Sequence, residues 1–110
     1  MNRTRSGSLR GSLDLLVLKA LSLQPLHGVG IFRRIQQITD GAVEVSYGSL
    51  FPALHRLEER GWLKAAWDAS EHNRQAKYYE ITRVGRRQLE REEREWQRIV
   101  DAVSAALRSS

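Results

Sequence analysis

The residue types that most often carry catalysis are sparse in this chain of 110 residues. Its histidines, His27, His55 and His72, form neither an H-x-x-x-H nor an H-E-x-x-H motif, the spacings that place two metal ligands on one helix face. Ser49 follows a glycine but does not lie in the G-x-S-x-G frame of a nucleophile elbow. The lack of cysteine excludes thiolate catalysis, disulfides and Cys-ligated zinc. We therefore expect no enzyme activity, no metal and no cofactor.

The cationic side chains are more informative about function than the histidines and serines, because an excess of positive charge favours binding to a polyanion. Lysine and arginine number 18 against 13 aspartate and glutamate, which leaves a formal net charge of +5, and the isoelectric point is about 10.2. This balance favours nucleic acid as the first partner to consider. An inert basic surface would have the same composition, so the placement of the charges has to decide between the two interpretations.

The stretch Ser46–Gly61 has the pattern of a helix that could enter the major groove of DNA. Its predicted buried face comprises Leu50, Leu54 and Leu57, extended by Phe51 and the following Trp62. The predicted opposite face has small groups near the start and cations toward the end: Ser49, Pro52, Ala53, Arg56 and Arg60. A recognition helix needs this order, because its first turns approach base edges and later residues meet phosphates. A solvated amphipathic helix would show the same pattern.

Pro52 makes the start of this helix ambiguous. Inside a helix, proline lacks an amide donor and clashes with the carbonyl four residues earlier, here that of Gly48, at a cost of about 3 kcal/mol. If Ser49 caps the helix, Pro52 is its third residue and the cost largely disappears. If Ser46 is the cap, Pro52 is the sixth residue and we expect a bend. In both cases Pro52 lies away from the leucines.

Other segments supply further groups suited to DNA. Arg33 belongs to an amphipathic helix expected over residues 26–41, and residues 1–11 are predicted to form a flexible basic arm. A polar loop between two predicted strands contains Arg74, with Lys77 next to it. The predicted DNA-binding residues are Ser46, Tyr47, Ser49, Pro52, Arg56, Arg33, Arg74 and Lys77.

The elements that must position these groups follow the order of a winged helix-turn-helix domain. Helices are predicted from Ser12 to just before Pro25 and over residues 26–41 and 46–61, with a short strand at 42–45. Alternating residues predict a hairpin of strands 62–68 and 77–81, joined by a long loop at 69–76. Thr82 is expected to cap a helix that runs to about Arg108. The expected class is mainly α with a small β hairpin (α+β): a flexible arm (1–11), a winged helix domain (12–82) and a C-terminal dimerisation helix (83–110).

The last helix carries an apolar seam that needs a partner. Its apolar residues recur at heptad spacing, which is typical of helices that pair. We expect a homodimer interface of Leu89, Trp96, Ile99, Val100, Val103 and Leu107. In a two-fold dimer, Trp96 and its symmetry mate could sandwich a planar ligand, or they could simply fill the interface. The predicted effector-binding residues are Trp96, Leu13, Leu16 and Val100.

In order and spacing, these motifs resemble the PadR family of bacterial transcriptional regulators. The most specific piece, "GSLFPALHRLE" at Gly48–Glu58, is similar to the family form G-S/T-L-Y-P-x-L followed by R-L-E. The second is Tyr78-Tyr79 leading into Ile81-Thr82 and Gly85. The similarity runs from about Gly11 to Leu107, which is nearly the whole chain.

The resemblance implies a homodimeric winged-helix repressor that binds operator DNA of approximate two-fold symmetry and is released by a small effector. Phenolic acids and flat lipophilic compounds are typical effectors of the family. Two family tyrosines are replaced, by Val29 and by Phe51, and each replacement removes a hydroxyl. The alternative is a winged-helix module that docks another protein without binding an operator. The composition fits a cytoplasmic location, and no run has the roughly 18 to 20 apolar residues of a membrane span.

Overall fold

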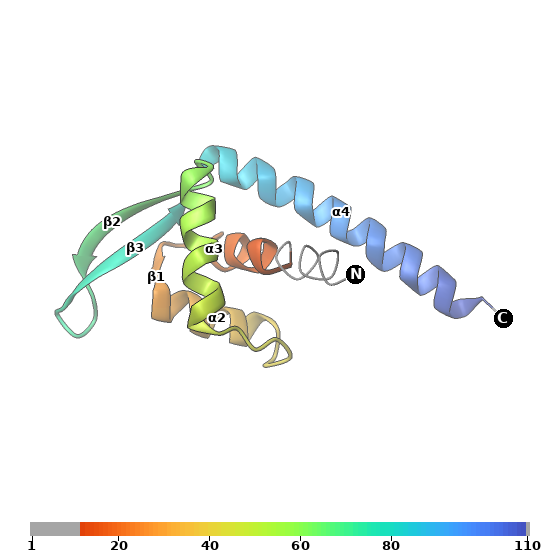
Figure 1. Ribbon diagram of the computed structural model, residues 1–110, viewed down its shortest axis with the longest axis horizontal. Coiled ribbons are helices and arrows are strands. Elements are labelled where there is room, and N and C mark those ends of the chain that lie inside the picture. Colours follow the sequence, from red (N-terminus) through yellow and green to blue (C-terminus); the bar gives the residue numbers. More distant parts are fainter. Residues whose placement is uncertain (1–11, 110) are drawn as a thin grey trace.

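The computed structural model describes residues 12–109, so the basic arm expected at residues 1–11 lies outside it. A first helix at residues 12–20 precedes the elements β1 (Leu26–His27), α2 (Gly28–Ile38), α3 (Tyr47–Glu59), β2 (Leu63–Ala69), β3 (Gln75–Ile81) and α4 (Arg83–Arg108). The shorter helices pack together, the β2–β3 hairpin extends from one side, and α4 extends from the other (Figure 1). This is the α+β winged helix-turn-helix with a long C-terminal helix that the sequence predicts.

The core lies between the shorter helices and the base of the sheet. Its buried apolar residues come from every helix and from the hairpin: Val17, Leu18, Ala20, Leu21, Ile31, Ile35, Leu50, Ala53, Leu54, Leu57, Leu63, Tyr79, Ile81 and Leu89. The leucine stripe of α3 is completely buried, as its helical spacing predicts. The edges of the stripe differ from the prediction, because Ala53 is buried and Phe51 is 49% exposed. Residues at the border between two faces of a helix are the ones that spacing alone misplaces.

Ser46 caps α3, which settles where the helix begins. Its side-chain oxygen accepts the backbone N–H of Ser49, and its own backbone is extended, with φ −89° and ψ 154°. Pro52 is therefore the sixth residue of the helix, and the helix continues through it to Glu59. The later start, with Ser49 as the cap and Pro52 in the first turn, is ruled out.

The sheet has three strands, namely the two of the predicted hairpin and β1, which the sequence does not predict. β1 pairs with β3 through Leu26 opposite Tyr79, which gives the order β1-β3-β2. The strand predicted at residues 42–45 is wrong, because this segment has no regular structure. The long hairpin loop is also wrong, since the strands pair as far as Ala69 and Gln75 and leave only residues 70–74 to connect them. Such a loop falls in the usual range for hairpins.

The start of α4 is locked onto the winged-helix core. Thr82 caps the helix, as predicted: its hydroxyl oxygen accepts the N–H of Gly85 at 3.0 Å and donates to the carbonyl of Gly61 at 2.7 Å. Gly85 and Leu89 are buried. The rest of α4 projects from the body, and the molecule measures 58 Å along its longest axis (Figure 1).

Two further properties concern only residues 12–109. No helix within them combines the length and the apolar character needed to cross a membrane. No cluster of histidine, aspartate or glutamate side chains among them is arranged to bind a metal ion.

Gly85→Ala should destabilise the protein by about 1–3 kcal/mol, the usual cost of overpacking. A Cβ at Gly85 would collide with the backbone carbonyl of Trp62 and lie 2.9 Å from the side chain of Ile81. This clash outweighs the gain of up to about 1 kcal/mol that alanine brings to a helix. Gly48→Ala is the matched control, because the nearest atom to its added Cβ is 3.7 Å away. Urea denaturation should show a loss for the first variant and no loss for the second; equal stabilities would contradict the packing described here.

Candidate nucleic-acid interface

The N-terminal half of α3 presents an exposed surface of hydroxyl and aromatic groups. Ser46 Oγ lies 3.2 Å from both the backbone N and the Oγ of Ser49, so the two hydroxyls stand together at the start of the helix. Tyr47 is 43% exposed, and Pro52 is also exposed. The structure thus brings together Ser46, Tyr47, Ser49 and Pro52 from the predicted set.

Neighbouring rings hold Tyr47 in place. The centroid of its ring lies 5.0 Å from that of Phe32 in α2 and 5.8 Å from that of Phe51 in α3, and both pairs are stacked. Such offset ring pairs contribute about 0.5–1.5 kcal/mol beyond their buried area. The stack therefore fixes the start of α3 against α2. Phe32 was not among the predicted residues, because its role depends on two separate helices meeting.

Arg56 points away from this surface and toward the first helix. Its Nη2 donates to Asp14 Oδ1 at 2.7 Å, and the two side chains are only 25% and 7% exposed. Arg56 Nε is also buried, without a hydrogen-bond partner among residues 12–109. Ions as buried as these are stable only when they are paired, so the contact ties α3 to the first helix. The structure does not bring Arg56 to the surface where the sequence expects it to contact DNA.

Positive charge near the exposed end of α3 must therefore come from other elements. Residues 47–55 contain no lysine or arginine. Arg60, at the far end, lies over the ring of Trp62, with 5.2 Å from its Cζ to the ring centroid. Of the two cations that the sequence assigns to this helix, neither stands free beside Tyr47 and Ser49.

The predicted cations outside α3 lie on α2 and on the β2–β3 hairpin, which we call the wing. Arg74 is exposed in the hairpin loop. Lys77 Nζ lies 3.4 Å from Glu58 Oε1, and Arg33 Nη1 lies 3.9 Å from Glu71 Oε1. All of these side chains are a third or more exposed. Surface pairs of this kind contribute at most about 1 kcal/mol, so an incoming phosphate can replace either carboxylate.

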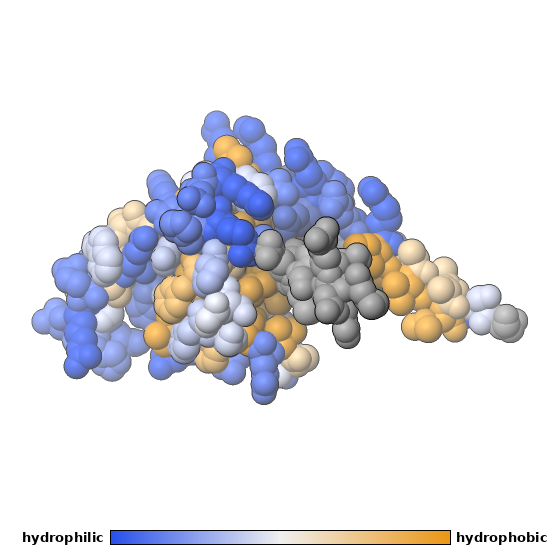
Figure 2. Space-filling model, viewed as in Figure 1, coloured by the Kyte–Doolittle hydropathy of each residue, from blue (hydrophilic) through white to orange (hydrophobic). Residues whose placement is uncertain are grey.

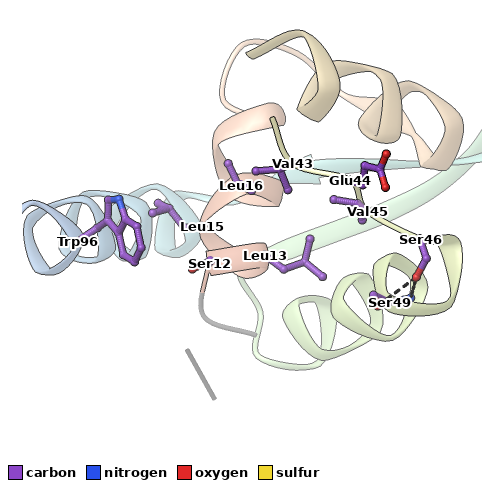
Figure 3. A pocket seen from close by; sticks show the side chains of 10 residues that line it. All are labelled: Ser12, Leu13, Leu15, Leu16, Val43, Glu44, Val45, Ser46, Ser49 and Trp96. Carbon is purple, nitrogen blue, oxygen red and sulfur yellow. Dashed lines mark hydrogen bonds between the residues drawn. The ribbon is translucent and has the colours of Figure 1, made fainter. Parts of the chain in front are cut away.

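A cavity of about 840 Å³ lies on the side of the first helix, between it and the segment before α3 (Figure 3). Three of the predicted effector residues line it, namely Leu13, Leu16 and Trp96, whereas Val100 does not. The other lining residues were not predicted to bind an effector, and they are Ser12, Leu15, Val43, Glu44, Val45, Ser46 and Ser49. The segment Val43–Val45, which the sequence predicts as part of a strand, has no regular structure and reaches the cavity only through the tertiary fold.

A carboxyl group flanks the tryptophan end of this cavity. Glu92 lines a smaller hollow that also includes Leu15, Trp96 and Ile99. Burial raises the pKa of Glu92 above its ordinary value, and the hydrogen bond from Gln88 opposes this change. The carboxyl beside Trp96 therefore accepts a proton more readily than a solvated one.

The outer half of α4 exposes a row of large apolar side chains. Their exposures range from 38% to 82%, and they are Trp96, Ile99, Val100, Val103 and Leu107. Orange apolar atoms gather along this part of the molecule in Figure 2. Leu89 differs from the rest of the predicted interface, because it is 6% exposed and packs in the core of its own chain.

Asp14→Asn should destabilise the protein by about 1–3 kcal/mol in urea denaturation, since it leaves Arg56 partly buried and unpaired. Arg56→Met should cost a similar amount. The double variant Asp14→Asn with Arg56→Met should lose less than the sum of the two single variants, because no buried charge then remains. Strictly additive losses would show that the two side chains do not act as a pair.

Comparisons with known proteins by sequence and by structure find the same kind of protein, a transcriptional regulator. Residues 17–91 match the family model described as "Transcriptional regulator PadR-like family". A transcriptional regulator from Clostridium thermocellum has a TM-score of 0.80 at 25% identity, with 90% of this chain and 96% of that chain covered. A PadR family regulator from Eggerthella lenta has a TM-score of 0.76 at 29% identity, with 98% of this chain and 93% of that chain covered. A PadR-like transcription factor from Bacteroides fragilis has a TM-score of 0.76 at 25% identity, with 94% of this chain and 98% of that chain covered.

An uncharacterised protein of Lysinibacillus sphaericus is 25% identical over 99 residues, which cover 90% of this chain and 91% of that protein. The family match spans the helices α2 and α3, the whole wing and the first turns of α4, and it therefore includes every residue predicted to contact DNA. The exposed apolar row on α4 lies beyond the match. The chain belongs to the PadR-like family of transcriptional regulators.

Proposed function

We propose that this regulator is a homodimeric repressor that binds operator DNA and is released by a small aromatic or lipophilic effector. The observation that carries the DNA part is the exposed start of α3. There Ser46, Tyr47 and Ser49 are exposed and offer hydroxyl groups, beside a wing that bears Arg74 and Lys77. A short polar surface of this kind can approach base edges closely while cations on another element contact the backbone.

In the proposed complex, α3 enters a major groove by its N-terminal end. Ser46, Tyr47 and Ser49 contact bases or nearby phosphates, and Pro52 shapes the surface beside them. Arg74, Lys77 and Arg33 contact the flanking backbone. Arg56 takes a different role from the one that its sequence position suggests: through Asp14 it holds α3 at a fixed angle to the first helix. Two subunits would place their α3 helices about 34 Å apart, in successive major grooves.

Binding of a duplex that carries the gene's own upstream region should weaken steeply as salt rises from about 50 to 200 mM. The logarithm of affinity should fall by about 0.9 for each phosphate contact per unit of log salt, because bound phosphates release counterions. Arg74→Gln should lower this slope by about 0.9, whereas Arg94→Gln, on the exposed part of α4, is the control and should leave it unchanged. Fluorescence anisotropy measures both. A flat salt response would favour the alternative, a module that docks another protein.

The homodimer is supported by the exposed apolar row on α4. Ile99 and Val103 are each 51% exposed, and Leu107 is 82% exposed. A soluble helix that leaves so many large apolar residues in water on one stripe usually has a partner. Because the row continues from Leu89, which is buried in the core, a second chain would extend an existing apolar surface rather than start a new one.

The effector site is supported by the cavity beside Trp96. Its walls are mostly apolar, with leucines of the first helix on one side and valines of the segment before α3 on the other. Pockets of about 300–1,000 Å³ with this character suit small organic ligands. The same cavity reaches Ser46 and Ser49 at the cap of α3 (Figure 3). A ligand there would therefore press on the helix that contacts DNA.

Trp96→Ala should weaken the dimer about tenfold to a hundredfold, since truncating a large aromatic residue in an interface commonly costs about 1–3 kcal/mol. Sedimentation over a range of concentrations measures this change. Gln97→Ala is the matched control, because its side chain is exposed and, within residues 12–109, bonds only to Asp101. If dimerisation and release by hydrophobic compounds are both unchanged in Trp96→Ala, then Trp96 has neither proposed role.

A further inference from the structure

The first two-thirds of α4 carry a straight row of arginines on one face. Successive residues of a helix are turned by about 100°, so residues three and four positions apart share a face. Between residues 83 and 98, one arc of about 80° contains five positions, and every one of them is arginine. These residues, which we call the arginine stripe, are Arg83, Arg87, Arg91, Arg94 and Arg98.

The arginine stripe faces away from the body of the molecule. Gly85 and Leu89, through which α4 packs on the core, lie on the opposite side of the helix. All five arginines are exposed, and strongly hydrophilic side chains project from α4 on the side away from the shorter helices in Figure 2. The apolar row from Trp96 to Leu107 also lies opposite the stripe, so a dimer that forms through this row leaves the stripe in water.

The stripe has no counter-charge within the described part of the chain. No side-chain hydrogen bond, ion pair or ring contact joins any of its arginines to another residue among 12–109. The sixth arginine of this stretch, Arg86, lies outside the arc and donates to the carbonyl of Ser22 at 3.0 Å. The carboxylates of the same stretch also fall outside the arc, and they are Glu90, Glu92, Glu93 and Glu95.

Neighbouring arginines of the stripe repel one another. Arg87, Arg91 and Arg94 follow at spacings of four and three residues, which bring side chains close together on a helix surface. Like charges at these spacings destabilise a helix. Negative charges placed along the stripe would remove this repulsion. The charge therefore favours a polyanion as the occupant of the stripe.

We propose that the arginine stripe holds a second duplex of DNA by its phosphates. The stripe is about 22 Å long, given a rise of about 1.5 Å per helical residue. Duplex DNA presents one negative charge per about 1.7 Å of its axis, so several phosphates lie within this length. The planar guanidinium of arginine binds phosphate through paired N–H donors. Phosphate contacts carry no sequence information, so the second duplex can have any sequence.

The second duplex is separate from the operator. The proposed operator surface lies around Ser46, at the N-terminal end of α3. In contrast, α4 begins at the other end of α3, where Thr82 donates to the carbonyl of Gly61 (Figure 1). The 13 residues of α3 separate the two ends by about 20 Å. A regulator with both surfaces occupied joins two segments of DNA. The inference rests on the proposed function only for the position of the operator.

Two other kinds of partner fit the stripe less well than DNA. A helix that lies on an anionic membrane buries apolar side chains next to its cations, whereas the apolar row of α4 is on the face opposite the stripe. A protein interface has aromatic or large apolar anchors near its centre, and the stripe contains none. Duplex DNA requires only a line of cations.

A capture assay with the full chain tests for the second duplex. A duplex that carries the gene's upstream region is fixed to beads, loaded with protein and mixed with a labelled duplex of unrelated sequence. The wild type should capture the labelled duplex at about 50 mM salt and release it as salt rises. Arg91→Gln with Arg94→Gln should capture about tenfold less, and the salt slope of capture should fall by about 1.8, for two lost phosphate contacts. Affinity for the bead-bound duplex should stay within about twofold.

Matched variants separate the stripe from general charge. Lys19→Gln with Lys64→Gln removes the same number of charges from exposed positions outside the stripe, and capture should stay within about twofold of the wild type. Glu90→Gln removes an exposed carboxylate beside the stripe and should raise capture about twofold, because it removes an anion that repels phosphate. A gain of capture cannot result from misfolding.

The outcomes distinguish the stripe from the proposed function. If the wild type binds the upstream duplex but captures no second duplex, or if the double arginine variant captures as much as the wild type, the stripe does not hold a second duplex and the proposed function stands. If the wild type does not bind the upstream duplex, the proposed function fails. The stripe is then tested by direct binding of the unrelated duplex, which the double arginine variant must weaken.

Two further results would overturn the proposal by identifying another occupant. If the double arginine variant binds the upstream duplex itself more weakly and the wild type captures no second duplex, the stripe contacts the flanks of the operator. If the wild type sediments with phosphatidylserine vesicles, the double arginine variant does not, and neither captures a second duplex, the stripe binds a membrane surface.

Discussion

Burial of Leu50, Leu54 and Leu57 fixes the rotation of α3 about its axis, and the surface that we propose contacts DNA depends on that rotation. Once these side chains are in the core, the helical period leaves Tyr47, Ser49 and Pro52 on the outside. A turn of one residue in register would bury polar groups and expose leucines. The Asp14–Arg56 ion pair and the ring stack on Tyr47 act on a helix whose orientation the apolar core has already set.

Elements with long periodic patterns could be predicted from the sequence, and short or tertiary features could not. The helical spacing of α3 and the cap at Thr82 are local properties of the chain, so both were predictable. β1 has two residues, too few to show any period, and it exists only because β3 lies beside it. Heptad spacing assigned Leu89 to the dimer seam, but spacing cannot show where a helix leaves the body of its own domain.

The same distinction applies to the candidate site. Ser46, Tyr47 and Ser49 lie near a helix start, which the sequence places at either Ser46 or Ser49 and the structure places at Ser46. The role of Arg56 depends on Asp14, which is 42 residues away in the chain, and no local pattern records that contact. The cavity beside the first helix combines marked leucines with an irregular segment, so only part of its wall could be expected. Asp14 lies among those leucines, and the first helix thereby touches both the cavity and α3.

The junction at Thr82 gives α4 the geometry of a lever. Its 26 residues make a helix about 39 Å long, and its base is clamped where α3 passes into β2. The clamp consists of two hydrogen bonds from Thr82, to the carbonyls of Gly61 and Trp62, and the close packing of Gly85. A rotation of about 5° at this base moves the far end by about 3 Å, given the rise per residue of a helix. If α4 moves as a rigid rod, a small displacement of its exposed tip corresponds to an angular change at the end of α3.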